Sequence, residues 1–167
     1  PGGNWGGDMA PPCSVAVSGE TMILGWGASE AGRAVVCTDF DGKVKWRHKR
    51  GGFGGAALVA ADGDVVYVYD QGQGNVLYRL TADKGDFKPW EGTQDSGLVM
   101  SDVVPGAKNA NLSGMDAHDG KLYLAFGSRA GTGLKQNSVN TLAVADANTG
   151  KVLKTIAIDD PGQVAYA

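Results

Sequence analysis

Residues 56–70 read AALVAADGDVVYVYD, two apolar runs separated by Asp62-Gly63-Asp64. Because Asp-Gly readily adopts the positive φ values of a two-residue hairpin turn, this stretch predicts two β-strands joined by a tight turn. Similar stretches surround Gly19 and Gly120. The three turn glycines therefore indicate a structural repeat and not a single irregular domain.

A second turn follows each of these hairpins. Its glycines lie at positions 42, 85 and 150, in step with the first set. Each unit thus contains two hairpins, or four short strands, in roughly the 40 to 50 residues of one β-propeller blade. The third unit is longer, and we assign its extra length to two loops, residues 91–111 and residues 127–140.

The repeat predicts an all-β chain that forms a β-propeller segment, with about three four-stranded antiparallel blades plus the first strand of a fourth. The expected divisions are an N-terminal loop over residues 1–12, blades over residues 13–50, 51–92 and 93–158, the last with long insertions, and the start of the next blade over residues 159–167. The final assignment depends on GQVAYA at 162–167, which resembles CSVAVS at 13–18. Three blades and one strand do not close a ring. We expect the rest of the propeller in missing sequence or in another copy of the chain.

Strand boundaries are clearest in the second unit, which is the most compact. Its strands are expected near residues 56–61, 65–70, 75–81 and 86–90. The long connection that follows is partly apolar between residues 97 and 104, where the chain either packs or forms a short strand of its own.

Composition excludes several classes of protein. With 43% hydrophobic and 20% charged residues, the chain is expected to bury a core and not to be disordered. A net charge of -3 argues against a non-specific nucleic-acid binder, and the basic cluster at residues 43–50 is interpreted as a solvated strand face. No apolar run approaches the roughly 18 residues of a membrane span.

The two cysteines are Cys13 and Cys37. They are expected on the first and third strands of one blade, with another strand between them, which is too far for a disulfide. We interpret both as buried free thiols, and this leaves the cellular compartment undecided.

The second turns carry a recurrent motif, seen at residues 39–46, 83–90 and 145–151. This motif resembles the Ala-x-Asp-x-x-Thr-Gly-Lys-x-x-Trp signature of the quinoprotein-like (PQQ-like repeat) β-propeller superfamily, and the resemblance spans residues 14–167. It implies that Trp46 and Trp90 pack between neighbouring blades, whereas Lys154 departs from the pattern. Such propellers occur as quinone-dependent dehydrogenases, as outer-membrane assembly scaffolds and as uncharacterised secreted bacterial proteins. The last group is the most similar, which implies a periplasmic or secreted location.

Nucleophilic catalysis by Ser or Cys needs a positioned histidine, and the chain has only His48 and His118. His118 precedes the Asp119-Gly120 turn, where a surface polar residue is typical, and His48 lies among like charges. We therefore assign no catalytic residue. His118 remains a candidate for ligand binding.

Asp116 is the most unusual residue in the repeat. An alignment on the turn glycines places it where the other units have Val15 and Val59, on an innermost strand. A buried unpaired carboxylate is costly. Asp116 therefore faces a wet central channel, or meets a partner such as Arg129, or the register differs by one residue.

The remaining candidates concern aromatic binding and metals. Trp5, in the N-terminal loop, is free to be a ligand-binding aromatic. The Asp-Gly turns are explained by backbone geometry, and the distal Glu of a calcium loop is absent, so we expect neither a metal nor a cofactor.

The sequence thus predicts a non-catalytic binding or scaffolding module. We expect a protein or glycan ligand at the loop-lined face, with residues 91–111 and 127–140 as the contact loops. The alternative is part of a propeller enzyme, quinone-dependent or glycan-processing, whose active site needs absent blades. We expect no nucleic-acid partner and no membrane span.

Overall fold

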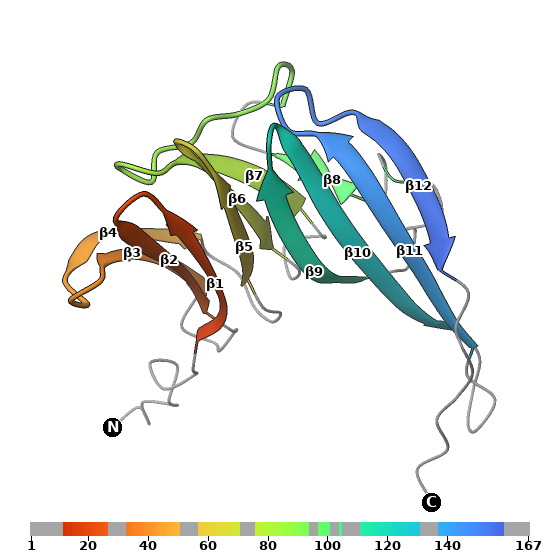
Figure 1. The fold of residues 1–167 in the computed structure, drawn as a ribbon, viewed down its shortest axis with the longest axis horizontal. Helices are drawn as coiled ribbons and strands as arrows, with labels where there is room; N and C mark the ends of the chain where they lie inside the picture. The colour runs from red at the N-terminus through yellow and green to blue at the C-terminus, as the bar shows by residue number, and fades with distance from the viewer. Residues whose placement is uncertain are drawn as a thin grey trace, which may run out of the picture.

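The structure is a computed structural model, and it describes residues 12–26, 33–50, 57–70, 76–93, 97–100, 104, 111–130 and 137–158. These residues form twelve β-strands in three four-stranded antiparallel sheets that stand side by side (Figure 1). The first sheet contains β1 (Pro12–Ser18), β2 (Thr21–Trp26), β3 (Arg33–Asp39) and β4 (Val44–Arg50). The second sheet contains β5 (Ala57–Asp62), β6 (Val65–Asp70), β7 (Val76–Thr81) and β8 (Leu98–Val99). The third sheet contains β9 (Asn111–His118), β10 (Lys121–Ala130), β11 (Asn137–Asp146) and β12 (Val152–Ile158). The all-β prediction is confirmed.

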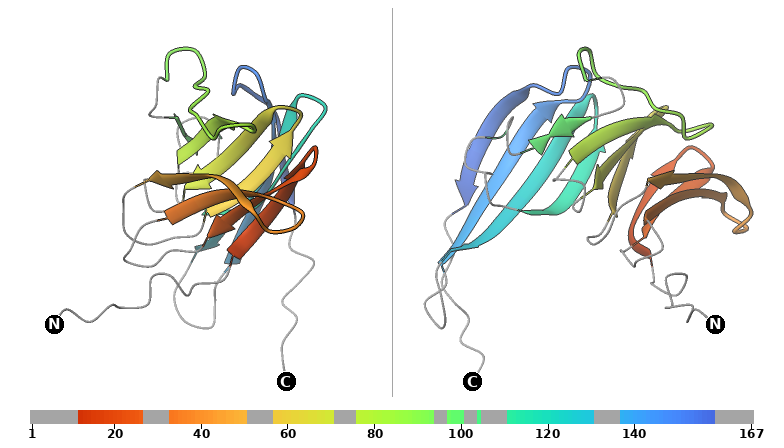
Figure 2. Two further views of the ribbon diagram at one scale, coloured as in Figure 1. Left: turned by 90° about the vertical axis from the view of Figure 1, so that its left-hand side faces the viewer. Right: turned by 180° about the vertical axis from the view of Figure 1, so that it is seen from behind.

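Each sheet is a meander in which consecutive strands are neighbours. The first strands of the sheets contact one another, so β5 lies between β1 and β9, and Figure 2 shows the same succession from behind. One core cluster, which includes Ile23, Cys37 and Val68, fills the space between the first and second sheets. Another, which includes Tyr69 and Leu124, fills the space between the second and third.

The hairpin turn between the first two strands is built differently in the third sheet. Its central residues are Gly19-Glu20 in the first sheet, Gly63-Asp64 in the second and Asp119-Gly120 in the third. Asp119 and Gly120 both have positive φ, at 50° and 70°, as a type I′ turn requires, whereas only the glycine does so in the other two turns. An alignment on glycines therefore shifts the third unit by one residue.

Two tryptophans join the sheets at the same place in the repeat. The Trp46 Nε1–H of the first sheet donates a hydrogen bond to the Ala82 carbonyl of the second, at 2.8 Å. The Trp90 Nε1–H donates to the Ala147 carbonyl of the third sheet, at 3.1 Å. Both side chains are buried, so the prediction that they pack between neighbouring units is confirmed. In the third sheet the position equivalent to Trp46 is occupied by Lys154, which therefore supplies no indole. Lys154 pairs with Val144 as Trp46 pairs with Cys37.

The fourth strand of the second sheet is not where the sequence predicts it. Residues 86–90 form only an isolated bridge between Leu80 and Phe87, and the strand that pairs with β7 is β8. Pro89 has no N–H for a ladder, which explains why this stretch does not continue as a strand. The prediction of a fourth strand at 86–90 is therefore wrong, and the second sheet reaches Val99, beyond the expected boundary at residue 92. The alternative of a short strand within residues 97–104 is confirmed.

The loop expected at residues 127–140 is largely a hairpin. β10 and β11 pair from Lys121 with Asp146 through to Ala130 with Asn137. Two ten-residue strands thus replace most of the predicted loop, because the polar residues at its ends join the ladder through their backbone groups. Only residues 131–136 remain between the strands, and they lie outside the described residues.

Cys37 is a buried free thiol, as predicted, and burial raises its pKa. Cys13 belongs to β1, but its side chain lies outside the described residues. The predicted start of a fourth unit, residues 159–167, and all but the last residue of the N-terminal loop also lie outside them.

Candidate functional site

Of the four candidate binding residues, the structure describes the side chains of two, Asp116 and His118. Trp5 lies outside the described residues. Arg129 belongs to β10, where its backbone pairs with Ser138, but its side chain is not among those described. Asp116 and His118 both lie on β9 and are exposed. Among the described side chains, these two are the candidates that the sequence already places close to each other.

The register of β9 explains Asp116. It pairs with Tyr123, whereas Ala60 pairs with Tyr67 at the corresponding position of the second sheet. The counterpart of Asp116 is thus an alanine and not Val59, and the alternative of a register that differs by one residue is correct. Ala60 packs toward the third sheet, so Asp116 lies on the face of the third sheet that is turned away from the second. The Asp116 carboxylate is solvated, and it accepts a hydrogen bond from the Ala117 N–H at 2.9 Å.

A direct pair between Asp116 and Arg129 is not supported by the register. Tyr123, opposite Asp116, and Arg129 are far apart along β10, at roughly 3.3 Å per residue or about 20 Å in all. The alternative in which Arg129 neutralises Asp116 is therefore excluded by the strand pairing.

His118 occupies a position that joins sheets elsewhere in the chain. Its counterparts are the residues before the turn in the other two sheets, Ser18 and Asp62. The Ser18 hydroxyl donates to the Gly63 carbonyl at 2.8 Å, and Asp62 Oδ2 accepts from the Gly120 N–H at 2.8 Å. In the third sheet the same position is occupied by His118, whose imidazole is exposed.

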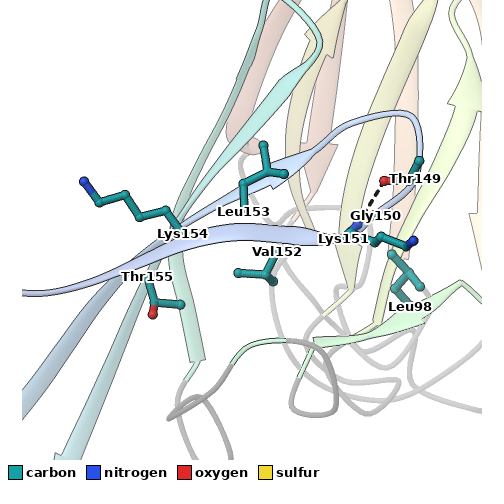
Figure 3. A pocket seen from close by; sticks show the side chains of 8 residues that line it. All are labelled: Leu98, Thr149, Gly150, Lys151, Val152, Leu153, Lys154 and Thr155. Atoms are coloured by element: carbon teal, nitrogen blue, oxygen red, sulfur yellow. Dashed lines mark hydrogen bonds between the residues drawn. The ribbon is translucent and has the colours of Figure 1, made fainter.

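Among the described residues, a groove lies between the outer edges of the second and third sheets. Its volume is about 630 Å³, and it is open to solvent. Seven consecutive residues of the third sheet, Thr149–Thr155, line one wall, and Leu98 of β8 contributes from the second sheet (Figure 3). Sequence analysis missed this site because its two walls are distant in the chain.

The groove combines apolar side chains with positive charge. Val152 and Thr155 lie on one side of β12, and Leu153, which is 58% exposed, lies on the other (Figure 3). A smaller hollow of about 240 Å³ continues from the groove between Glu91, Asn148, Thr149 and Lys151. β12 is the last strand of its sheet and pairs only with β11 among the described residues. No described strand pairs with the other side of its backbone, which can therefore accept another strand.

Asp146 fixes the turn that begins this wall. Its Oδ1 accepts hydrogen bonds from the Asn148 N–H at 3.0 Å, from the Thr149 N–H at 2.7 Å and from the Thr149 hydroxyl at 3.0 Å. These bonds favour the carboxylate over the carboxylic acid, so the hydrogen bonds from Thr149 lower the pKa of Asp146. Gly150, with φ at 72°, then brings the chain against Leu98.

A buried arginine holds the same turn from the second sheet. The Arg79 Nε donates to the Lys88 carbonyl and Nη2 donates to the Pro89 carbonyl, both at 2.9 Å. Nη1 crosses to the third sheet, where it donates to the carbonyls of Ala147 at 3.2 Å and Asn148 at 3.3 Å. Burial lowers the pKa of this guanidinium from its ordinary value. Arg79 thus positions the groove wall although it does not line the groove.

No group of three or more His, Cys, Asp or Glu residues suited to a metal ion occurs in the part of the chain that the structure describes. Within the same residues, no helix has the length and apolar character needed to cross a membrane. No family model matches the sequence, and no curated protein matches it either.

Proposed function

We propose that the three sheets are blades of a β-propeller of the quinoprotein-like kind, and that the chain is a non-catalytic binding or scaffolding module. The observation that carries the proposal is the groove in which one edge strand supplies a continuous wall and the neighbouring sheet supplies Leu98. A scaffold that presents an edge strand beside an apolar wall is suited to hold a partner chain. A periplasmic or secreted location is part of the same proposal, by resemblance.

The ligand is an extended protein segment that adds a strand to β12. Main-chain hydrogen bonds to the open edge supply affinity, and alternate side chains of the ligand enter the groove and supply specificity. Leu98 and Val152 favour an apolar ligand side chain, because both are only partly buried in the free chain. Lys151 and Lys154 favour an acidic residue nearby.

A labelled peptide tests this binding mode. The peptide has about seven residues, the length of β12, with valine alternating with glutamate, and binding is followed by fluorescence polarisation and by amide chemical shifts. We expect shift changes confined to residues 149–158, which include the whole of β12, and to Leu98. Leu98→Ser and Lys151→Glu should each weaken binding by about tenfold, which corresponds to roughly 1.4 kcal/mol.

Lys84→Glu is the matched control, because Lys84 is an exposed lysine on a turn of the second sheet that does not line the groove. Its affinity for the peptide should equal that of the unchanged protein. Equal affinities for all three variants, or shift changes on strands outside the groove, would contradict the proposal. Binding of a glycan and not of the peptide would replace the ligand class.

A further inference from the structure

A small hollow lies at the end of the groove, where β12 begins. Its volume is about 240 Å³, and its walls are Glu91, Asn148, Thr149 and Lys151. This volume corresponds to about eight water molecules at roughly 30 Å³ each, which is about the room of one amino-acid residue. The groove contains leucine and valine side chains, whereas the hollow is lined by polar and charged residues alone. The hollow therefore suits a polar group of the ligand and not an apolar one.

The hollow carries one charge of each sign. Glu91 supplies a carboxylate from the side of the second sheet, and Lys151 supplies an ammonium from the third sheet. Both side chains are exposed. Among the described residues, ion pairing joins Lys88 to Asp64 and does not join Glu91 to Lys151. The two charges thus share one hollow without neutralising each other, and both are available to a ligand.

The two walls of the hollow are fixed relative to each other. Arg79, which is buried, donates a hydrogen bond to the carbonyl two residues before Glu91, at 2.9 Å, and another to the Asn148 carbonyl in the opposite wall, at 3.3 Å. Asp146 accepts hydrogen bonds from the N–H and the hydroxyl of Thr149, at 2.7 and 3.0 Å. The backbone on both sides of the hollow is therefore held before a ligand binds, which lowers the conformational entropy that binding costs.

The hollow lies beyond one end of β12, so the direction of a bound strand decides which terminus reaches it. β12 starts at Val152, and three of the residues that line the hollow lie within 148–151, directly before it. A strand added antiparallel to β12 runs toward Val152, so its C-terminal end arrives at the hollow. Every strand pair in the described part of the chain is antiparallel, and antiparallel pairing is slightly more stable than parallel pairing. The hollow is therefore placed to receive the C-terminus of the ligand.

We propose that the hollow recognises the last residue of the bound segment, and that this residue is a lysine or arginine with a free carboxylate. The Lys151 ammonium pairs with the terminal carboxylate, and the Glu91 carboxylate pairs with the basic side chain. Glu91 would repel a carboxylate alone, and Lys151 would repel a cation alone, so a residue with both charges complements the hollow. The inference rests on the proposed strand addition at β12 and names the end of the ligand that this site selects.

Three peptides, each labelled at its N-terminus, test the selection on the full chain by fluorescence polarisation. The first is the valine–glutamate peptide extended by a C-terminal lysine with a free carboxylate. The second has the same sequence with a C-terminal carboxamide, and the third has a free carboxylate with the lysine moved to the N-terminus. We expect the first to bind about threefold to fivefold more tightly than each of the others, because exposed ion pairs contribute modestly. High salt should reduce this difference.

Two substitutions separate the two contacts. Glu91→Gln should remove the preference for the C-terminal lysine over the N-terminal lysine and keep the preference for the carboxylate over the carboxamide. Lys151→Gln should do the reverse. Both residues are exposed, so both variants should keep the melting temperature of the unchanged chain. Lys84→Gln removes an exposed lysine outside the groove and the hollow, and it should leave the ratios of the three affinities unchanged.

The outcomes separate this inference from the proposed function. Equal binding of the three peptides overturns the inference and leaves strand addition at β12 intact, because the groove would then bind without reading the terminus. Tightest binding of the peptide with the N-terminal lysine also overturns it, since a parallel strand would bring that end to the hollow. A preference for the first peptide that survives both Glu91→Gln and Lys151→Gln places the recognition elsewhere and overturns it too. Binding of none of the peptides overturns the inference together with the proposed function.

Discussion

The second sheet and the first sheet have the same strand order but very different burial. Every residue of β6 is buried, whereas residues of β2 at corresponding positions alternate between buried and half-buried. The difference follows from the neighbouring sheets, since in the part of the chain that the structure describes the second sheet has a sheet on each face and the first has one on a single face. Burial in this fold is therefore a property of stacking, as in other repeat proteins in which one unit cannot bury its own faces.

The same comparison applies to polar groups. At the junction of the second and third sheets, Asp62 accepts a hydrogen bond from a backbone N–H of the third sheet. Arg79 and Trp90 each donate a hydrogen bond to a backbone carbonyl of that sheet. The junction of the first and second sheets uses neutral groups instead, including Ser14, whose hydroxyl accepts from the Val59 N–H at 2.9 Å. The hydrogen bonds from Arg79 Nη1 and Trp90 to the Ala147 carbonyl are buried, whereas those of Ser14 and Trp46 at the first junction are only partly buried, so the loss of a donor is expected to cost more at the second junction.

Trp90→Ala should have the largest effect on stability. Trp90 is 2% exposed and lies 4.5 Å from the Arg79 guanidinium, so we expect a loss of about 3 to 5 kcal/mol in the free energy of unfolding. Trp46→Ala should cost about 1 kcal/mol less, because Trp46 is 9% exposed and the described residues place no such cation over its ring. Urea unfolding measures both losses.

Leu153→Ala provides the reference for an exposed apolar side chain, with an expected change below about 0.5 kcal/mol. Equal losses for Trp46→Ala and Trp90→Ala would show that the two junctions have the same strength, which contradicts the comparison.

Gly85→Ala and Gly42→Ala compare a turn that Trp46 covers with one that no described residue covers. Both substitutions place a side chain at positive φ, which costs about 1 to 2 kcal/mol. Only Gly85→Ala also places a Cβ against Trp46, which adds about 1 to 3 kcal/mol. Among the described residues, a Cβ at Gly42 would meet nothing within 4 Å. Urea unfolding measures both losses, and a larger loss for Gly42→Ala than for Gly85→Ala would contradict the comparison.

Much of the fold follows from the sequence because the repeat is local. The turn glycines and the apolar runs predict the hairpins. The resemblance of the repeated motif to a known signature implies the junctions at Trp46 and Trp90. The errors arise where tertiary context decides. Asp119 stands where the other two turns have their glycine, so an alignment on the turn glycines gives β9 a register that is wrong by one residue. This error changes the interpretation of Asp116.

The candidate site was less predictable than the fold. The groove joins β12 to Leu98 across two sheets, and no local pattern relates these segments. Arg79 carried a usable signal, since it is the single charge within the apolar stretch Val76–Thr81, and a charge on a central strand implies a buried partner. The carbonyl groups that satisfy it became visible only with the third sheet in place.

The smallest effect is expected at the turn before the groove, on acidification. The pKa of Asp146 is lowered in the folded chain, so the carboxylate stabilises the fold above the unfolded pKa, near 3.9, and this contribution is lost as pH falls through the folded value. In the equivalent turn of the first sheet, Asp39 accepts hydrogen bonds from two backbone N–H groups, at 3.1 and 2.8 Å. Asp146 accepts three hydrogen bonds, one of them from a hydroxyl. Carboxyl chemical shifts should therefore show Asp146 titrating below its ordinary range. Asp146→Asn keeps an acceptor oxygen but does not titrate. The melting temperature of this variant should therefore fall less between pH 6 and pH 3 than that of the unchanged chain. An equal fall would mean that the charge of Asp146 does not stabilise the third-sheet turn.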